Sequence, residues 1–216
     1  MSRLGTVALL ATTLLTLSAS FGQSIALTAD PDAIEEDWVL VVGNPDPTGV
    51  GPQITTVMSP VSDASSAPFI AFDLNYREYP NFAPGGMQIQ VWSSGQVLDT
   101  SGQGNALFNA AGETVTWTQR MAISAGTLNY NVDNGQSTTW GQFGQGSHLT
   151  VSVPTTLTSL AGYLPSVSAA KSGASWQENH VTTLTLKEVR YYAHNHLIWT
   201  DTNPKLLVDN ASDSGD

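Results

Sequence analysis

Period-two alternation of apolar and polar residues, broken by clusters of glycine and proline, is the feature that most limits the folds open to this chain. Side chains on a β-strand point to opposite faces in turn, so this alternation predicts strands with one buried face. Helical periodicity is nearly absent, which favours an all-β, antiparallel sandwich. The predicted strands are Trp38–Val42, Gln53–Met58, Pro68–Tyr76, Met87–Trp92, Thr114–Ile123, Thr127–Val132, Thr138–Trp140, His148–Val153 and Val181–Tyr192.

The strongest local turn signal is the pair Asn134-Gly135, which follows a strand that ends at Val132. Both residue types tolerate positive φ, the conformation that a type I′ turn requires at its two central positions. The pair therefore predicts a tight hairpin. A short helical turn is expected at Ser159–Tyr163.

The first residues have the pattern of a cleavable signal peptide. Arg3 supplies an early positive charge, Val7–Leu17 is an apolar run, and small residues follow. The apolar run is shorter than the roughly 20 residues that a membrane span needs. We predict a signal peptide over residues 1–22, cleaved near Gly22/Gln23, and a secreted or extracytoplasmic protein (periplasm or cell surface) without a membrane span.

Composition divides the rest of the chain into three parts. Residues 23–36 have the composition of an acidic leader, 37–201 that of one β-sandwich domain, and 202–216 that of a flexible acidic tail. The chain has no cysteine, so packing alone must stabilise the sandwich. Its formal charge of −11 repels phosphate, which makes nucleic acid a poor partner.

Alternation also assigns a polar face to four successive strands. If these strands share one sheet, their polar sides form a single surface of amide, guanidinium and carboxylate groups around an outward-facing tryptophan. A sugar ring has an apolar face and a polar rim, so it suits such a surface. The same pattern also fits the solvated side of an ordinary antiparallel sheet. The candidate ligand-binding residues are Asp73, Asn75, Arg77, Gln88, Gln90, Trp92, Arg120, Asn129 and Asn131.

A family resemblance rests on the passages Phe69–Tyr76, Gly85–Trp92, Thr114–Ile123 and Leu128–Gly135. Together they resemble the concanavalin A-like lectin/glucanase superfamily, including its laminin G-like members. The resemblance implies a jelly-roll sandwich whose concave face commonly binds glycans. The chain is also similar to uncharacterised exported proteins of planctomycete-type bacteria. The Glu-x-Asp-x-x-Glu strand of the glucanase branch does not occur in the sequence, so the resemblance implies no catalytic residue.

We therefore expect an exported module that binds a glycan or cell-surface polysaccharide, without catalytic activity and without a cofactor. One alternative is a polysaccharide hydrolase or lyase that uses Asp73 and Glu78, and another is a structural envelope or matrix protein. His194 and His196 would share one face of a strand, which suggests a metal site, but the sequence has no His-Glu-x-x-His motif and no cysteine, which argues against a transition metal. Calcium bound by oxygens of Asp30, Asp32 and Glu35 is the one metal site that the acidic leader suggests.

Overall fold

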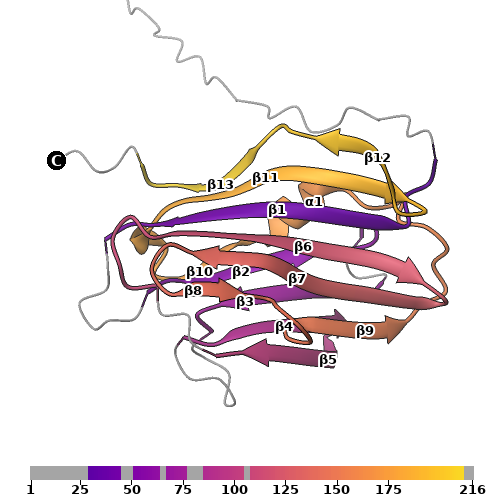
Figure 1. Ribbon diagram of the computed structural model, residues 1–216, viewed down its shortest axis with the longest axis horizontal. Helices are drawn as coiled ribbons and strands as arrows, with labels where there is room; N and C mark the ends of the chain where they lie inside the picture. The colour runs from indigo at the N-terminus through magenta and orange to yellow at the C-terminus, as the bar shows by residue number, and fades with distance from the viewer. Residues whose placement is uncertain (1–28, 45–50, 64–66, 77–84, 105–107, 212–216) are drawn as a thin grey trace, which may run out of the picture.

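Two antiparallel sheets packed face to face form the protein (Figure 1). The computed structural model describes residues 29–44, 51–63, 67–76, 85–104 and 108–211. The expected signal peptide lies outside these residues, and so do Arg77 and Glu78. The prediction of an all-β antiparallel sandwich is confirmed.

The large sheet contains eight strands in the described part of the chain. Its order is β12-β11-β1-β6-β7-β8, with β13 also paired to β11 and β9 also paired to β7. The bounds of its strands are β1 Ala33–Val42, β6 Thr114–Ser124, β7 Thr127–Ser137, β8 Gly141–Phe143, β9 Thr150–Pro154, β11 Val181–Ala193, β12 His196–Asp201 and β13 Lys205–Asp209.

The small sheet has the order β10-β2-β3-β4-β5. A short helix, α1, and a single 3-10 turn lie between β9 and β11. The bounds are β2 Gln53–Met58, β3 Phe69–Leu74, β4 Met87–Ser93, β5 Gln96–Gln103, β10 Gly173–Trp176, α1 Pro165–Lys171 and the 3-10 turn Glu178–His180.

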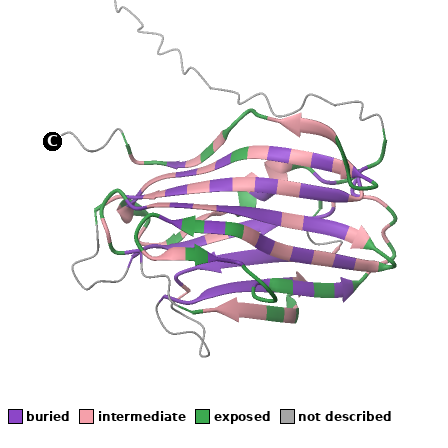
Figure 2. Cartoon of the chain, viewed as in Figure 1, coloured by how far each residue is buried: buried purple, intermediate pink, exposed green. Residues whose placement is uncertain are grey.

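The core between the sheets is aromatic at its centre. Along most strands, buried side chains alternate with more exposed ones, as Figure 2 shows for the large sheet. Trp38 of β1 stacks on Trp117 of β6 with ring centroids 6.2 Å apart, and Phe72 of β3 meets Trp117 edge-on at 5.8 Å. Each such aromatic pair adds about 1 kcal/mol to the stabilisation that burial gives. This packing joins the two sheets without a disulfide.

One carboxyl group also points into the core. Glu36 is completely buried and lies opposite Gln119 of β6. It accepts hydrogen bonds from Trp38 Nε1 at 3.0 Å and from the Tyr163 hydroxyl at 2.5 Å. Burial raises the pKa of Glu36 to about 7, and these hydrogen bonds oppose the rise only in part. Below about pH 7 the folded protein therefore favours the protonated form of Glu36.

Both ends of the domain extend beyond the predicted strands. β1 begins at Ala33 instead of Trp38, so the end of the expected acidic leader is part of the sheet. Glu36 is polar but faces the core, so the alternation of apolar and polar residues is interrupted there. β13 occupies Lys205–Asp209, where composition predicts a flexible tail, because it pairs with β11.

Smaller departures occur along the middle of the chain. The edge strand near residue 140 is Gly141–Phe143 and not Thr138–Trp140, which lies in a turn. Helix α1 begins at Pro165, just after the predicted helical turn, and proline suits the first helical position. β5 and β10 have partly exposed, weakly apolar sequences, so alternation does not predict them.

The prediction of a hairpin at Asn134-Gly135 is wrong. β7 continues through both residues to Ser137, and the β6–β7 register shifts between Thr116 and Thr118, which forms a β-bulge. Asn134 adopts a φ of 54°, as a turn residue would. Gly135 is needed for a different reason, because a Cβ there would lie 2.5 Å from Cγ of Phe143.

The tight hairpins lie at three other residue pairs. In each, two residues with positive φ connect neighbouring strands, as type I′ geometry requires. The pairs are Ser94-Gly95 between β4 and β5, Ala125-Gly126 between β6 and β7, and His194-Asn195 between β11 and β12.

We predict that Gly135→Ala lowers the free energy of unfolding by about 2 kcal/mol, because the added methyl group collides with the Phe143 ring. Urea denaturation followed by tryptophan fluorescence measures the change. Gly104→Ala is the matched control, since a Cβ at Gly104 would meet no atom within 4 Å. Equal stability of the two variants would contradict this account of Gly135.

The raised pKa of Glu36 predicts a pH dependence of stability. Between about pH 4.5 and pH 7 the folded state binds a proton that the unfolded state has released, so the free energy of unfolding falls as pH rises and levels off above pH 7. The total fall is roughly 3 kcal/mol, the equivalent of this pKa change. Glu36→Gln should remove it, measured as the difference between the two proteins' stability profiles.

Asp73 titrates in the same direction, because burial raises its pKa to about 6. The interval between pH 6 and pH 7 therefore reports mainly on Glu36. A native profile that is as flat there as that of Glu36→Gln would show that Glu36 ionises normally in the fold.

Candidate functional site

The nine sequence-predicted candidates do not share one surface. β3 and β4 belong to the small sheet, whereas β6 and β7 belong to the large sheet. The expected surface therefore divides into two separate sets. The small sheet holds Asp73, Asn75, Gln88, Gln90 and Trp92, the large sheet holds Arg120, Asn129 and Asn131, and Arg77 lies outside the described residues.

The small-sheet set is mostly buried. The exposed fractions of Asp73, Gln88 and Gln90 are 4%, 2% and 2%, and only Trp92 is half-buried. Thr55 donates a hydrogen bond of 2.5 Å to Asp73, and Gln88 donates one to Thr100. These polar groups face outward from the sheet yet are closed off from solvent. They do not form the open platform that the sequence pattern suggests.

Asn75 has a structural role in the described fold. Its side chain is completely buried and donates to the backbone oxygens of Gly51 at 2.7 Å and Pro52 at 3.2 Å. It also accepts a hydrogen bond from the backbone nitrogen of Gly85 at 2.7 Å. Asn75 thereby connects the segments that lead into β2 and β4, and its φ of 56° suits asparagine.

The large-sheet set lies on the outer face of that sheet beside a ladder of charges. Arg120 Nε lies 3.3 Å from Glu35, which also accepts from Arg190 Nε at 3.1 Å. Arg190 in turn donates to Asp37 at 2.9 Å through its second terminal nitrogen. Burial lowers the pKa of Arg190, but the hydrogen bonds that Arg190 donates to Asp37 and Glu188 raise it by more, so the net change is upward. The two arginines thus balance much of the acidic charge on β1.

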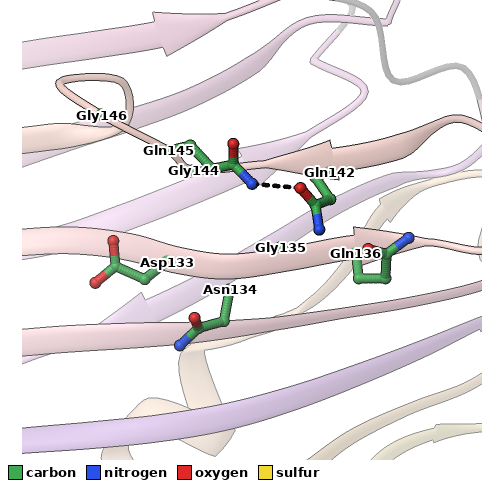
Figure 3. A pocket seen from close by; sticks show the side chains of 8 residues that line it. All are labelled: Asp133, Asn134, Gly135, Gln136, Gln142, Gly144, Gln145 and Gly146. Carbon is green, nitrogen blue, oxygen red and sulfur yellow. Dashed lines mark hydrogen bonds between the residues drawn. The ribbon is translucent and has the colours of Figure 1, made fainter.

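A pocket of about 540 Å³ opens where β7 meets β8, beyond this ladder (Figure 3). The bulge in β7 supplies one wall, and β8 with the glycine-rich segment after it supplies the other. We call this the amide pocket. Its lining residues are Asp133, Asn134, Gly135, Gln136, Gln142, Gly144, Gln145 and Gly146.

Local backbone structure positions the side chains of the amide pocket. Gln136 and Gln142 are paired across β7 and β8 and both are exposed. Gln145 donates a hydrogen bond of 2.6 Å to Gln142, as Figure 3 shows. Gly144 has a φ of 71°, and its nitrogen donates to the side chain of Gln103 in β5. The pocket is therefore held to the small sheet as well.

Asp133 is the one ionisable residue in the lining. Burial raises the pKa of Asp133, while the nearby Arg120 lowers it and Glu35 raises it. Asn131 also donates a hydrogen bond to its carboxylate. The lining includes no lysine, arginine or aromatic residue. Such a site suits a ligand rich in uncharged hydrogen-bonding groups.

Sequence reasoning missed Gln136, Gln142 and Gln145. Gln142 and Gln145 lie in the glycine-rich run at residues 141–146, and Gln136 follows the Asn134-Gly135 pair, so all three lie in segments that read as boundaries between strands. The repeated pairing of glutamine with glycine in that run is the signal that distinguishes it from an ordinary turn.

The expected calcium ligands do not converge. Asp30 is exposed, Asp32 accepts from the backbone nitrogen of His194 at 2.8 Å, and Glu35 contacts two arginines. Among the described residues there is no group of three or more His, Asp or Glu side chains arranged to hold a metal ion. In the same residues, no helix has the length and apolarity to cross a membrane.

No protein-family model matches the chain, and no curated protein matches it. Among solved structures, the chain is similar to the enzymatically active domain of tailspike protein 2 of bacteriophage CBA120, with a TM-score of 0.33 and 16% identity over 78% of this chain and 23% of that one. The chain is also similar to full-length tailspike protein 2 from the Escherichia coli O157:H7 bacteriophage CAB120. The TM-score is 0.30 and the sequence identity is 14%, and the match covers 77% of this chain and 21% of that one.

The chain thus spans less than a quarter of either tailspike structure. TM-scores this low carry no functional argument.

We predict that Asn75→Asp lowers the free energy of unfolding by about 2–3 kcal/mol, because the aspartate loses both donated hydrogen bonds and sets a buried carboxylate against two carbonyls. Chemical denaturation measures this loss. Asn134→Asp is the matched control, since Asn134 has nearly the same φ but is exposed. Comparable losses in both variants would argue against the buried contacts as the cause.

Proposed function

We propose that this protein is an exported, non-catalytic β-sandwich that binds an uncharged glycan in the amide pocket. The observation that supports the proposal most directly is the composition of the pocket lining, with four amide side chains, one carboxylate and three glycines. Export is proposed from the signal-peptide pattern of residues 1–22.

Amide side chains suit sugar hydroxyls because each amide offers both donors and acceptors, and each hydroxyl needs both. Gln136, Gln142 and Gln145 are exposed, so their groups are accessible to a ligand. Gly146 has no Cβ and open space around it, so a sugar ring can approach the backbone closely there. Pockets of this size, a few hundred cubic ångströms, are typical of small-ligand sites.

The absence of catalysis is proposed from the carboxyl groups. Glycoside hydrolysis usually needs two carboxyls across the scissile bond, and Asp133 is the one acid in the pocket lining. Of the two acids that the sequence suggests for catalysis, Asp73 is in the small sheet and 4% exposed, and Glu78 lies outside the described residues. An uncharged ligand is favoured because the lining offers no cation to an anionic sugar.

We predict that Gln136→Ala and Gln142→Ala each weaken glycan binding about tenfold, since each removes a donor and an acceptor from the pocket. A glycan array identifies the ligand, and isothermal titration calorimetry with the strongest hit measures affinity. Gln96→Ala, at an exposed position in β5, is the matched control.

Trp92→Ala separates this proposal from binding at the small sheet, where Trp92 lies. Full binding by Trp92→Ala, with loss in the two pocket variants, supports the amide pocket. Loss in Trp92→Ala with full binding by the pocket variants would show that the amide pocket is not the site.

A further inference from the structure

The outward side chains of β7 continue the chemistry of the amide pocket along the strand. They are polar and half-buried or exposed, whereas the alternate residues Leu128, Tyr130 and Val132 are completely buried. We call the outward set the β7 strip: Asn129, Asn131, Asp133, Asn134 and Gln136. The partners of its ends on β6, Ala122 and Thr116, are six residues apart, so at about 3.3 Å per residue the ends of the strip are about 20 Å apart, a length that several linked sugar rings are needed to cover.

Hydroxyl side chains border the β7 strip on both sides. On β6, Thr118 pairs with Asp133 and Thr116 pairs with Gln136. On the other side, the partners on β9 are Ser152 opposite Asn129 and Thr150 opposite Asn131. These neighbours broaden the strip into a surface of short, uncharged hydrogen-bonding groups.

The strip carries one ionisable residue. That residue is Asp133, and burial raises its pKa, while the charge of Arg120, which pairs with Asn131, opposes the rise. No large apolar side chain stands on the strip to anchor a protein partner, which usually needs a buried aromatic or aliphatic group. A polyanion would find one arginine that already contacts Glu35. An uncharged polymer rich in hydroxyl groups therefore fits the strip better than a protein partner or a polyanion does.

The side chains of the strip are also partly ordered before any ligand binds. Ser152 donates a hydrogen bond of 2.8 Å to Asn129, and Asn131 donates to Asp133. Side chains that are already held in place lose less conformational entropy when a ligand binds. These held side chains include Asn129, which lies at the end of the strip farthest from the amide pocket.

We infer that the protein binds the interior of an uncharged linear polysaccharide. The polysaccharide lies along the β7 strip, and some of its sugar units occupy the amide pocket. The inference rests on the proposed function and adds that several consecutive sugar units are recognised, instead of a chain end alone.

The test is calorimetry of the full chain with uncharged glucan, mannan, galactan and xylan oligosaccharides of two to six units. For the oligosaccharide that binds, we expect affinity to rise about tenfold or more from two to six units. Gln142→Ala should weaken binding at every length. Asn129→Ala should abolish most of the gain at six units and leave the affinity for two units unchanged.

Gln96→Ala and the melting temperature of each variant serve as controls. Affinity that depends on Gln142 but does not change with length would overturn the inference and leave the proposed function standing. The same holds if Asn129→Ala binds six units as well as the native protein does. No binding of any uncharged oligosaccharide or polysaccharide by the native protein would overturn the proposed function itself.

Discussion

The stack of Trp38 on Trp117 is the contact around which the sandwich is built. The two rings, 6.2 Å apart, lie on β1 and β6 near the middle of the large sheet. Phe72 of the small sheet packs edge-on against Trp117, Phe143 of β8 lies 6.2 Å from Phe72, and Trp140 lies 5.2 Å from Phe143. A continuous series of ring contacts therefore leads from the centre of the core to the sheet edge that carries the amide pocket. In a chain without cysteine, this packing must stabilise the pocket as well as the fold.

The β-bulge in β7 connects the core to the pocket. On its inner side, Gly135 leaves room for the Phe143 ring, so the bulge is part of the core packing. On its outer side, the extra residue places both Asn134 and Gln136 in the pocket lining. In a regular strand Asn134 and Gln136 would lie on one face and Asp133 on the other, whereas the bulge brings all three into the pocket lining. The same local irregularity thus satisfies a packing requirement and creates a binding surface.

Sequence alternation predicts the strands whose inward positions are mostly apolar, and β2, β4, β6 and β11 begin where it places them. It fails where an inward position is polar, as at Glu36, and at edge strands such as β5. Alternation also identifies the residues that share one face of a strand but not the sheet to which the strand belongs. For this reason Arg120, Asn129 and Asn131 were predictable as a polar set, whereas their grouping with Asp73 and Gln88 was not.

The structure gives the amide side chains of the two sheets different surroundings. In the small sheet they are buried, and the amide of Asn75 is used entirely by the backbone. On the large sheet they are accessible, and Arg120 and Arg190 contact two of the acids nearby, Glu35 and Asp37. The chain as a whole has a formal charge of −11, yet the β7 strip itself carries a single ionisable residue, Asp133. The net charge of the protein is therefore a poor guide to the ligand, whereas the uncharged amides along the strip favour an uncharged one.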